Sequence, residues 1–177
     1  KKGLDYLYKK NTSDDIFSLT YHYPFGSESD NQYAVAADYL SYVGTDKLSN
    51  EKIQQQFFKL ACSYNVSVGD DAINISISGL NSNMPAAVRL LENVLTSAKA
   101  DKESYDKYVG IVLKARADAK GEQRANFSAL TMLGEYGAYN PQLNDMSEKQ
   151  LRDADPQALL DKLKNLNRYR ATVMYFG

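Results

Sequence analysis

The chain has 177 residues, of which 44% are hydrophobic and 24% are charged, as in an average globular domain with one substantial core. Its 21 basic and 22 acidic residues give a net charge of -1 without a basic stripe, which argues against nucleic acid as a partner. No stretch approaches the roughly 18 consecutive apolar residues that a membrane span needs, so no span is predicted.

The N-terminal part predicts two strands and a helix. Residues 4–9 alternate in polarity, and residues 15–23 are rich in β-branched and aromatic side chains, so both segments favour strands. Apolar residues then recur at helical spacing, which predicts an amphipathic helix over 29–43. Gly44 directly follows this helix, which predicts that it forms a left-handed C-terminal cap.

A second helix is predicted over residues 50–64, with Ser49 or Asn50 as its N-cap. It would carry Cys62 on its apolar face. Cys62 is interpreted as a small buried hydrophobe, and a reactive thiol is the alternative.

A β-hairpin is predicted after the second helix, with strands over 65–69 and 72–80 joined by a short turn. In the second strand three isoleucines alternate with three small polar residues, so one face of the strand is expected to be buried and the other to be exposed to solvent. The isoleucines are Ile73, Ile75 and Ile77, and the polar residues are Asn74, Ser76 and Ser78.

The helices that follow are predicted from residues typical of helix ends and breaks. A third helix is expected over 84–97, capped by Asn83 and with Pro85 in its first turn. The next helical run, 102–137, contains Gly121, where we expect a break or kink.

Two more helix starts and a last strand complete the chain. Ser147 begins the sequence SEKQ, a capping-box pattern, and Asp155 followed by Pro156 opens another helix. Residues 170–176 favour a strand. Strands and helices occur in groups, which predicts an α+β fold with helices packed on one face of a mostly antiparallel sheet.

Few residues of the chain are of the types that bind metals or catalyse reactions. A catalytic zinc site needs about three protein ligands, but the chain has a single histidine, His22, and a single cysteine, Cys62. No metal ligand and no catalytic residue is therefore predicted, and no nucleophile elbow or phosphate loop occurs. The acidic pairs at 14–15 and 70–71 are better explained as turn residues than as general acid–base catalysts. An enzyme working with carboxylates alone, such as a glycosidase, remains an alternative, but no spacing marks a facing pair.

Residues 33–45, YAVAADYLSYVGT, resemble a helix of the pitrilysin/insulinase-like (M16) zinc metallopeptidases. In the catalytic domains of that family this helix carries a His-x-x-Glu-His motif and is followed by Gly-Thr. Aligned on Gly-Thr, the first histidine position falls on Val35, the glutamate position on Asp38 and the second histidine position on Tyr39. The distal glutamate ligand, on a later helix, falls at Ala115. The resemblance therefore implies an inactive domain of the family with a degenerate motif.

The resemblance extends over nearly the whole chain, through the hairpin, the helix pair that follows it and the closing strand. It implies the metallohydrolase-like fold of LuxS and of mitochondrial processing peptidase. It also implies that residues 1–177 form one inactive domain of a longer multi-domain peptidase, most like the first domain of its C-terminal half. Bacterial relatives with this pattern favour the periplasm or cell envelope, although the compartment stays open.

The function implied by the resemblance is indirect. The chain would help to enclose peptide substrate in a chamber, with zinc bound on a separate catalytic domain and with other M16 domains or a catalytic subunit as partners. Substrate contacts would come from Asn74, Ser76 and Ser78, or from tyrosines such as Tyr21 and Tyr23. The alternative is an M16-like interaction module with no role in proteolysis. The parent would then lack a motif-bearing domain.

Overall fold

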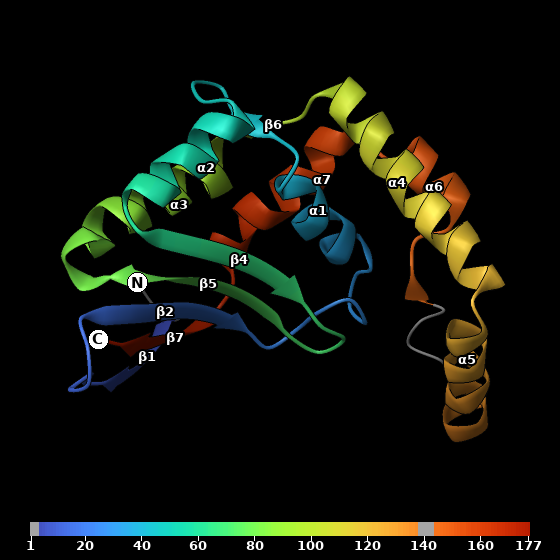
Figure 1. Cartoon of the computed structure of the whole chain (residues 1–177), viewed down its shortest axis with the longest axis horizontal. Helices are drawn as coiled ribbons and strands as arrows, with labels where there is room; N and C mark the ends of the chain where they lie inside the picture. Colours follow the sequence, from blue (N-terminus) through green and yellow to red (C-terminus); the bar gives the residue numbers. More distant parts are fainter. Residues whose placement is uncertain (1–3, 138–143) are drawn as a thin grey trace.

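The computed structural model describes residues 4–137 and 144–177, which form one sheet with helices on one side (Figure 1). The sheet has five strands in the order β1-β7-β2-β5-β4, and only the β1–β7 pair is parallel. The predicted α+β class with a mostly antiparallel sheet is confirmed. The strands are β1 (Leu4–Lys9), β2 (Ile16–Tyr23), β4 (Cys62–Val68), β5 (Ile73–Leu80) and β7 (Ala171–Phe176).

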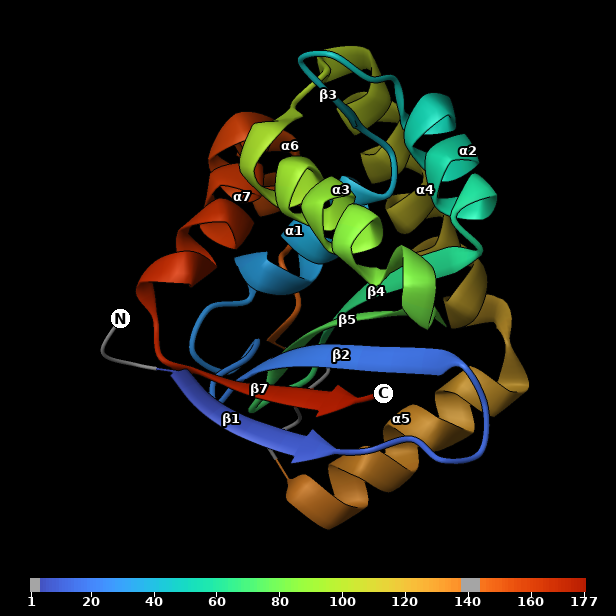
Figure 2. The same ribbon diagram turned by 90° about the vertical axis from the view of Figure 1, so that its left-hand side faces the viewer.

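The described part of the chain also contains seven α-helices and a small two-stranded sheet of β3 (Gly44–Thr45) and β6 (Ala98–Lys99). Helices α1, α2, α3 and α7 lie over one face of the large sheet (Figure 2), and α4 and α5 form an arm beside them (Figure 1). The helices are α1 (Gln32–Leu40), α2 (Asn50–Lys59), α3 (Met84–Ser97), α4 (Lys102–Gly121), α5 (Gln123–Tyr136), α6 (Glu148–Asp153) and α7 (Pro156–Lys164).

The core lies between the sheet and the helices. Alternation in β5 points Ile73, Ile75 and Ile77 into this core, where each is almost completely buried. The opposite face of the sheet is not covered by any described element (Figure 2). Among the described helices, none is long and apolar enough to cross a membrane.

Several predicted helix ends are confirmed. Ser49 caps α2 by accepting a hydrogen bond from the Lys52 amide, and Ser147 forms the predicted capping box with Gln150. The helical run 102–137 breaks at Gly121, where α4 gives way to α5 through an extended Glu122.

Three local predictions are wrong. Cys62 is not on a helix, because the chain leaves α2 at Leu60, turns through Ala61 with a positive φ of 49° and enters β4 at Cys62. Gly44 does not cap α1: it lies in β3, where a Cβ atom would approach the carbonyl oxygen of Leu48 to 2.3 Å. Asn83 makes no capping bond, because its side-chain amide donates to the Leu60 carbonyl at 2.8 Å.

Candidate functional site

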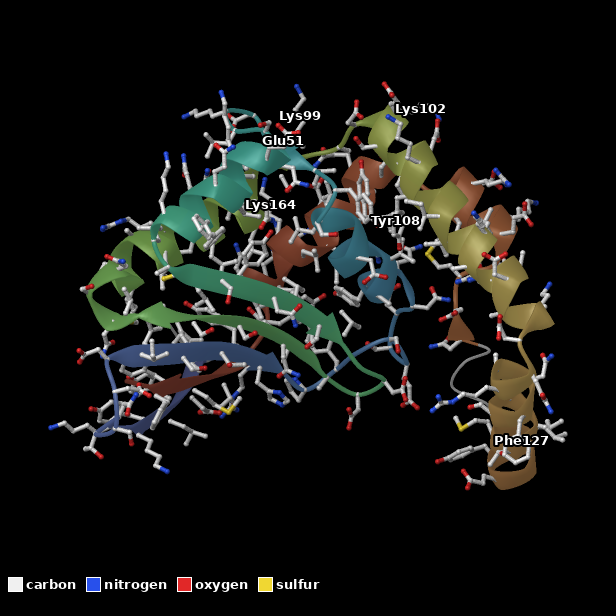
Figure 3. The ribbon with its side chains drawn as sticks, in the orientation of Figure 1. Glu51, Lys99, Lys102, Tyr108, Phe127 and Lys164 are labelled. Atoms are coloured by element: carbon white, nitrogen blue, oxygen red, sulfur yellow. The ribbon has the colours of Figure 1, made fainter. Side chains whose placement is uncertain are left out.

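Three of the four degenerate motif positions line one cleft. Val35 and Asp38 on α1 face Ala115 on α4 across a cleft of about 560 Å³, which we call the α1–α4 cleft. Helix α4 is held beside α1 by aromatic packing, and Figure 3 shows Tyr108 of α4 between the two helices. The spacing of the aligned positions along the chain therefore corresponds to proximity in space.

The fourth position, Tyr39, points elsewhere. Its ring is fully buried and packs edge-on against Tyr105 at 5.0 Å between centroids. Its hydroxyl donates to the Asp101 carbonyl at 2.9 Å and accepts from the Asp101 amide at 3.1 Å. Tyr39 thus ties α1 to the start of α4 and does not line the cleft.

The electrostatics of the α1–α4 cleft centre on Asp38. Partial burial raises the pKa of its carboxyl above the ordinary value, and the nearby carboxylate of Asp145 raises it further. Burial, and next the charge of Asp38, raise the pKa of the Tyr108 hydroxyl, so this phenol stays protonated at neutral pH. Arg116 pairs with Asp145 at 3.2 Å and donates to the Met146 carbonyl at 2.6 Å.

The described residues contain no cluster of three or more His, Cys, Asp or Glu side chains that could hold a metal ion. His22 lies on β2, where its Nδ1 is 2.9 Å from the Asn74 side-chain oxygen. Cys62 is buried at the start of β4, and burial raises the pKa of its thiol. These two residues lie on different strands, and neither lines the α1–α4 cleft.

A second cleft of about 820 Å³ lies between α1, α2 and the edge strand β4. Asp38 and Ser41 line both clefts, so the two clefts are adjacent near the end of α1. Sequence reasoning missed this cleft and Phe58, which lines it and is 85% exposed. The sequence did hold a signal for an exposed aromatic residue: Phe58 lies outside the apolar stripe of α2, which contains Ile53 and Phe57.

The candidate substrate-contact residues Asn74, Ser76 and Ser78 share the uncovered face of β5 and are partly exposed. Tyr21 and Tyr23 lie on the opposite, helix-covered face, so the two candidate groups do not form one surface. From β4 to β7 the uncovered face carries no Asp, Glu, Lys or Arg, by the alternation and register of the strands. We call it the open face; it comprises Ser63, Asn65, Ser67, Asn74, Ser76, Ser78, Leu80, Ile16, Ser18, Thr20, His22, Thr172, Met174 and Phe176.

Helix α5 presents a second uncovered surface. It projects from the body of the molecule, and Figure 3 places Phe127 on it. None of its side chains is buried, and Phe127, Leu130 and Leu133 are 71%, 65% and 53% exposed. These three residues are spaced to share one side of the helix, and we call them the α5 apolar side.

Comparisons with known proteins show which solved structures share this fold. No protein-family model and no curated protein sequence matches the chain. An M16 peptidase inactive domain from Pseudomonas fluorescens matches with a TM-score of 0.82 and 17% identity, covering 99% of this chain and 44% of that one. The periplasmic protease PqqL from Escherichia coli matches with a TM-score of 0.75 and 15% identity, over 96% of this chain and 19% of that one.

A mutant of the ferredoxin protease FusC, solved in complex with Arabidopsis ferredoxin, matches with a TM-score of 0.79 and 12% identity, over 97% of this chain and 20% of that one. This chain therefore spans less than half the length of the three solved chains. It has the fold of M16 peptidase domains, and the fold expected from the sequence resemblance is confirmed.

Proposed function

We propose that this chain is a non-catalytic M16 domain that helps to form the peptide-enclosing chamber of a zinc-dependent endopeptidase. The zinc site, with its His-x-x-Glu-His motif, lies on another domain in this proposal. One observation carries it. The fold matches an M16 inactive domain over 99% of the chain, and alignment of the sequence on Gly44-Thr45 assigns Val35, Tyr39 and Ala115 to the positions of the three zinc ligands.

The residues at those positions have roles that do not fit a metal site. Val35 and Ala115 have no atom that could donate an electron pair to zinc, and the hydroxyl of Tyr39 is occupied by the backbone of Asp101. Asp38 replaces the glutamate that activates water in catalytic domains. The mechanism of the catalytic domains needs a metal ion to lower the pKa of the attacking water, and among the described residues Asp38 has no cluster of metal ligands beside it, so this chain by itself is proposed to lack peptidase activity.

Two uncovered surfaces support a role within a larger assembly. The α5 apolar side exposes three large residues on a projecting helix, and the open face lacks the charged residues that usually cover a solvated sheet. Both are suited to packing against other protein, because burying a neutral surface incurs no charge-desolvation cost. We propose that further M16 domains, in the same polypeptide or in a catalytic partner subunit, cover them.

The test compares peptide hydrolysis and bound zinc for three samples: this chain, the motif-bearing part of its parent, and their mixture. The proposal expects neither zinc nor hydrolysis from this chain, and hydrolysis from the mixture above that of the motif-bearing part. Stoichiometric zinc with hydrolysis by this chain alone would refute the proposal. Association without any gain in hydrolysis would instead support an interaction module that has no role in proteolysis.

A matched pair of variants locates the contact. Phe127→Asp places a charge on the α5 apolar side and is expected to weaken association at least tenfold. Ser128→Asp introduces the same charge on the other side of α5, where the side chain is also exposed, and is expected to leave association unchanged. Equal effects of the two variants would exclude the α5 apolar side as the contact.

A further inference from the structure

The α1–α4 cleft has apolar residues and two carboxylates, Asp38 and Asp145, in its lining. Val35, Ile111 and Ala115 supply apolar surface from the two helices, and Asp38 lines both this cleft and the second one. Ala115 has a small, exposed side chain and therefore occupies little of the space beside it in the cleft. A flexible aliphatic chain of several methylene groups can pack on these apolar residues while the charge at its end reaches Asp38.

Two tyrosines form the aromatic wall of the same cleft. The rings of Tyr42 and Tyr108 lie 5.4 Å apart, with an angle of 56° between their planes, and both residues line the cleft. Tyr42 is 40% exposed, so its ring is accessible from solvent. The electron-rich face of a phenol ring attracts ammonium and guanidinium groups within about 6 Å. This wall therefore favours a cation over an anion or a neutral polar group.

Asp38 forms no ion pair within 4.0 Å among the described residues. The guanidinium of Arg116, which also lines the cleft, is already paired with Asp145 and with the Met146 carbonyl. Asp145 adds negative potential at Asp38, and Lys59 lines the second cleft without pairing with Asp38. A cationic ligand would supply the counter-ion that Asp38 lacks here.

We propose that the α1–α4 cleft binds a lysine or arginine side chain of a peptide, with the cationic headgroup between Asp38 and the Tyr42–Tyr108 wall and the aliphatic part against Val35, Ile111 and Ala115. The peptide as ligand rests on the proposed function. The cleft lined by two of the three aligned zinc-ligand positions, Val35 and Ala115, then serves here as a recognition pocket for a basic side chain. No bond is made or broken in this step.

The test measures binding of capped tripeptides to the 177-residue chain by NMR titration or calorimetry. Acetyl-Gly-Arg-Gly-amide is compared with the same peptide containing citrulline, which has nearly the shape of arginine but no charge. We expect the arginine peptide to bind about fivefold tighter or more, and the difference to shrink as salt is added. Equal affinity for the two peptides would overturn the proposal.

Variants locate the headgroup and the stem separately. Asp38→Asn is expected to remove the preference for arginine over citrulline, whereas Asp46→Asn, at another exposed carboxylate, is expected to preserve it. Ala115→Phe fills the cleft without changing any charge, and it is expected to abolish binding of both peptides. Circular dichroism checks that each variant is folded.

Retention of the preference in Asp38→Asn, or normal arginine binding by Ala115→Phe, would each overturn this placement. These assays use the chain alone and require no hydrolysis. A negative result here therefore leaves the proposed role in a zinc peptidase untouched, and a negative mixing experiment leaves the pocket untouched.

Discussion

Substitution of Tyr39 tests whether this residue is a structural tie between two helices. Its hydroxyl is both donor and acceptor to the backbone of Asp101, the N-cap residue of α4. Tyr39→Phe removes only this oxygen and keeps the ring that packs against Tyr105 and Tyr108. The expected loss is therefore that of two neutral hydrogen bonds, with the Asp101 amide left without its partner.

The expected size follows from the exposure of Asp101. A buried amide that loses its partner costs about 1–3 kcal/mol, but Asp101 is exposed and water can replace part of the lost bonding. We therefore expect Tyr39→Phe to reduce the free energy of unfolding by about 1–2 kcal/mol. For a domain of this length that corresponds to a decrease in Tm of roughly 2–8 °C.

Thermal and urea unfolding followed by circular dichroism would measure this loss. Tyr42→Phe is the matched control, because the Tyr42 hydroxyl makes no hydrogen bond with any described residue. Tyr39→His adds an imidazole at an aligned ligand position, and we expect it to destabilise the fold further without recruiting zinc. Equal stability of Tyr39→Phe and the wild type, or stoichiometric zinc in Tyr39→His, would refute this account of the site.

Four other outcomes are expected. Ser147→Ala removes the capping box of α6 and should lower the unfolding free energy by about 1 kcal/mol in urea titrations. Gly79→Ala would place a Cβ atom 2.4 Å from the Ala61 carbonyl oxygen, and should cost more than about 2 kcal/mol by the same measurement. The Cys62 thiol, whose pKa is raised by burial, should react with an aromatic disulfide reagent much more slowly in the native than in the urea-unfolded chain. The pKa of the Asp38 carboxyl is raised above 3.8 in the folded state, so the unfolded chain loses this proton first and stability falls as pH rises through that range. Asp38→Asn should therefore raise Tm near neutral pH and have little effect at about pH 3, where the carboxyl is protonated in both states.

The sequence by itself determined the elements whose pattern is local. Alternation of isoleucine with small polar residues identified β5 and its two faces, and the Ser147 pattern identified the start of α6. The break at Gly121 was visible because glycine weakens a helix at its own position. Three positions that the resemblance aligned with the zinc motif, Val35, Asp38 and Ala115, line one cleft in the structure.

The tertiary structure alone decided where elements end and what each side chain meets. Ala61 turns with a positive φ so that Cys62 can join the sheet, and Gly44 is needed because the Leu48 carbonyl approaches it closely. Tyr39 faces Asp101, and Tyr42 and Tyr108 meet at the cleft, through contacts between segments 60 or more residues apart. Residue patterns along a chain report local periodicity and capping, whereas these contacts depend on how the helices pack, which no single segment specifies.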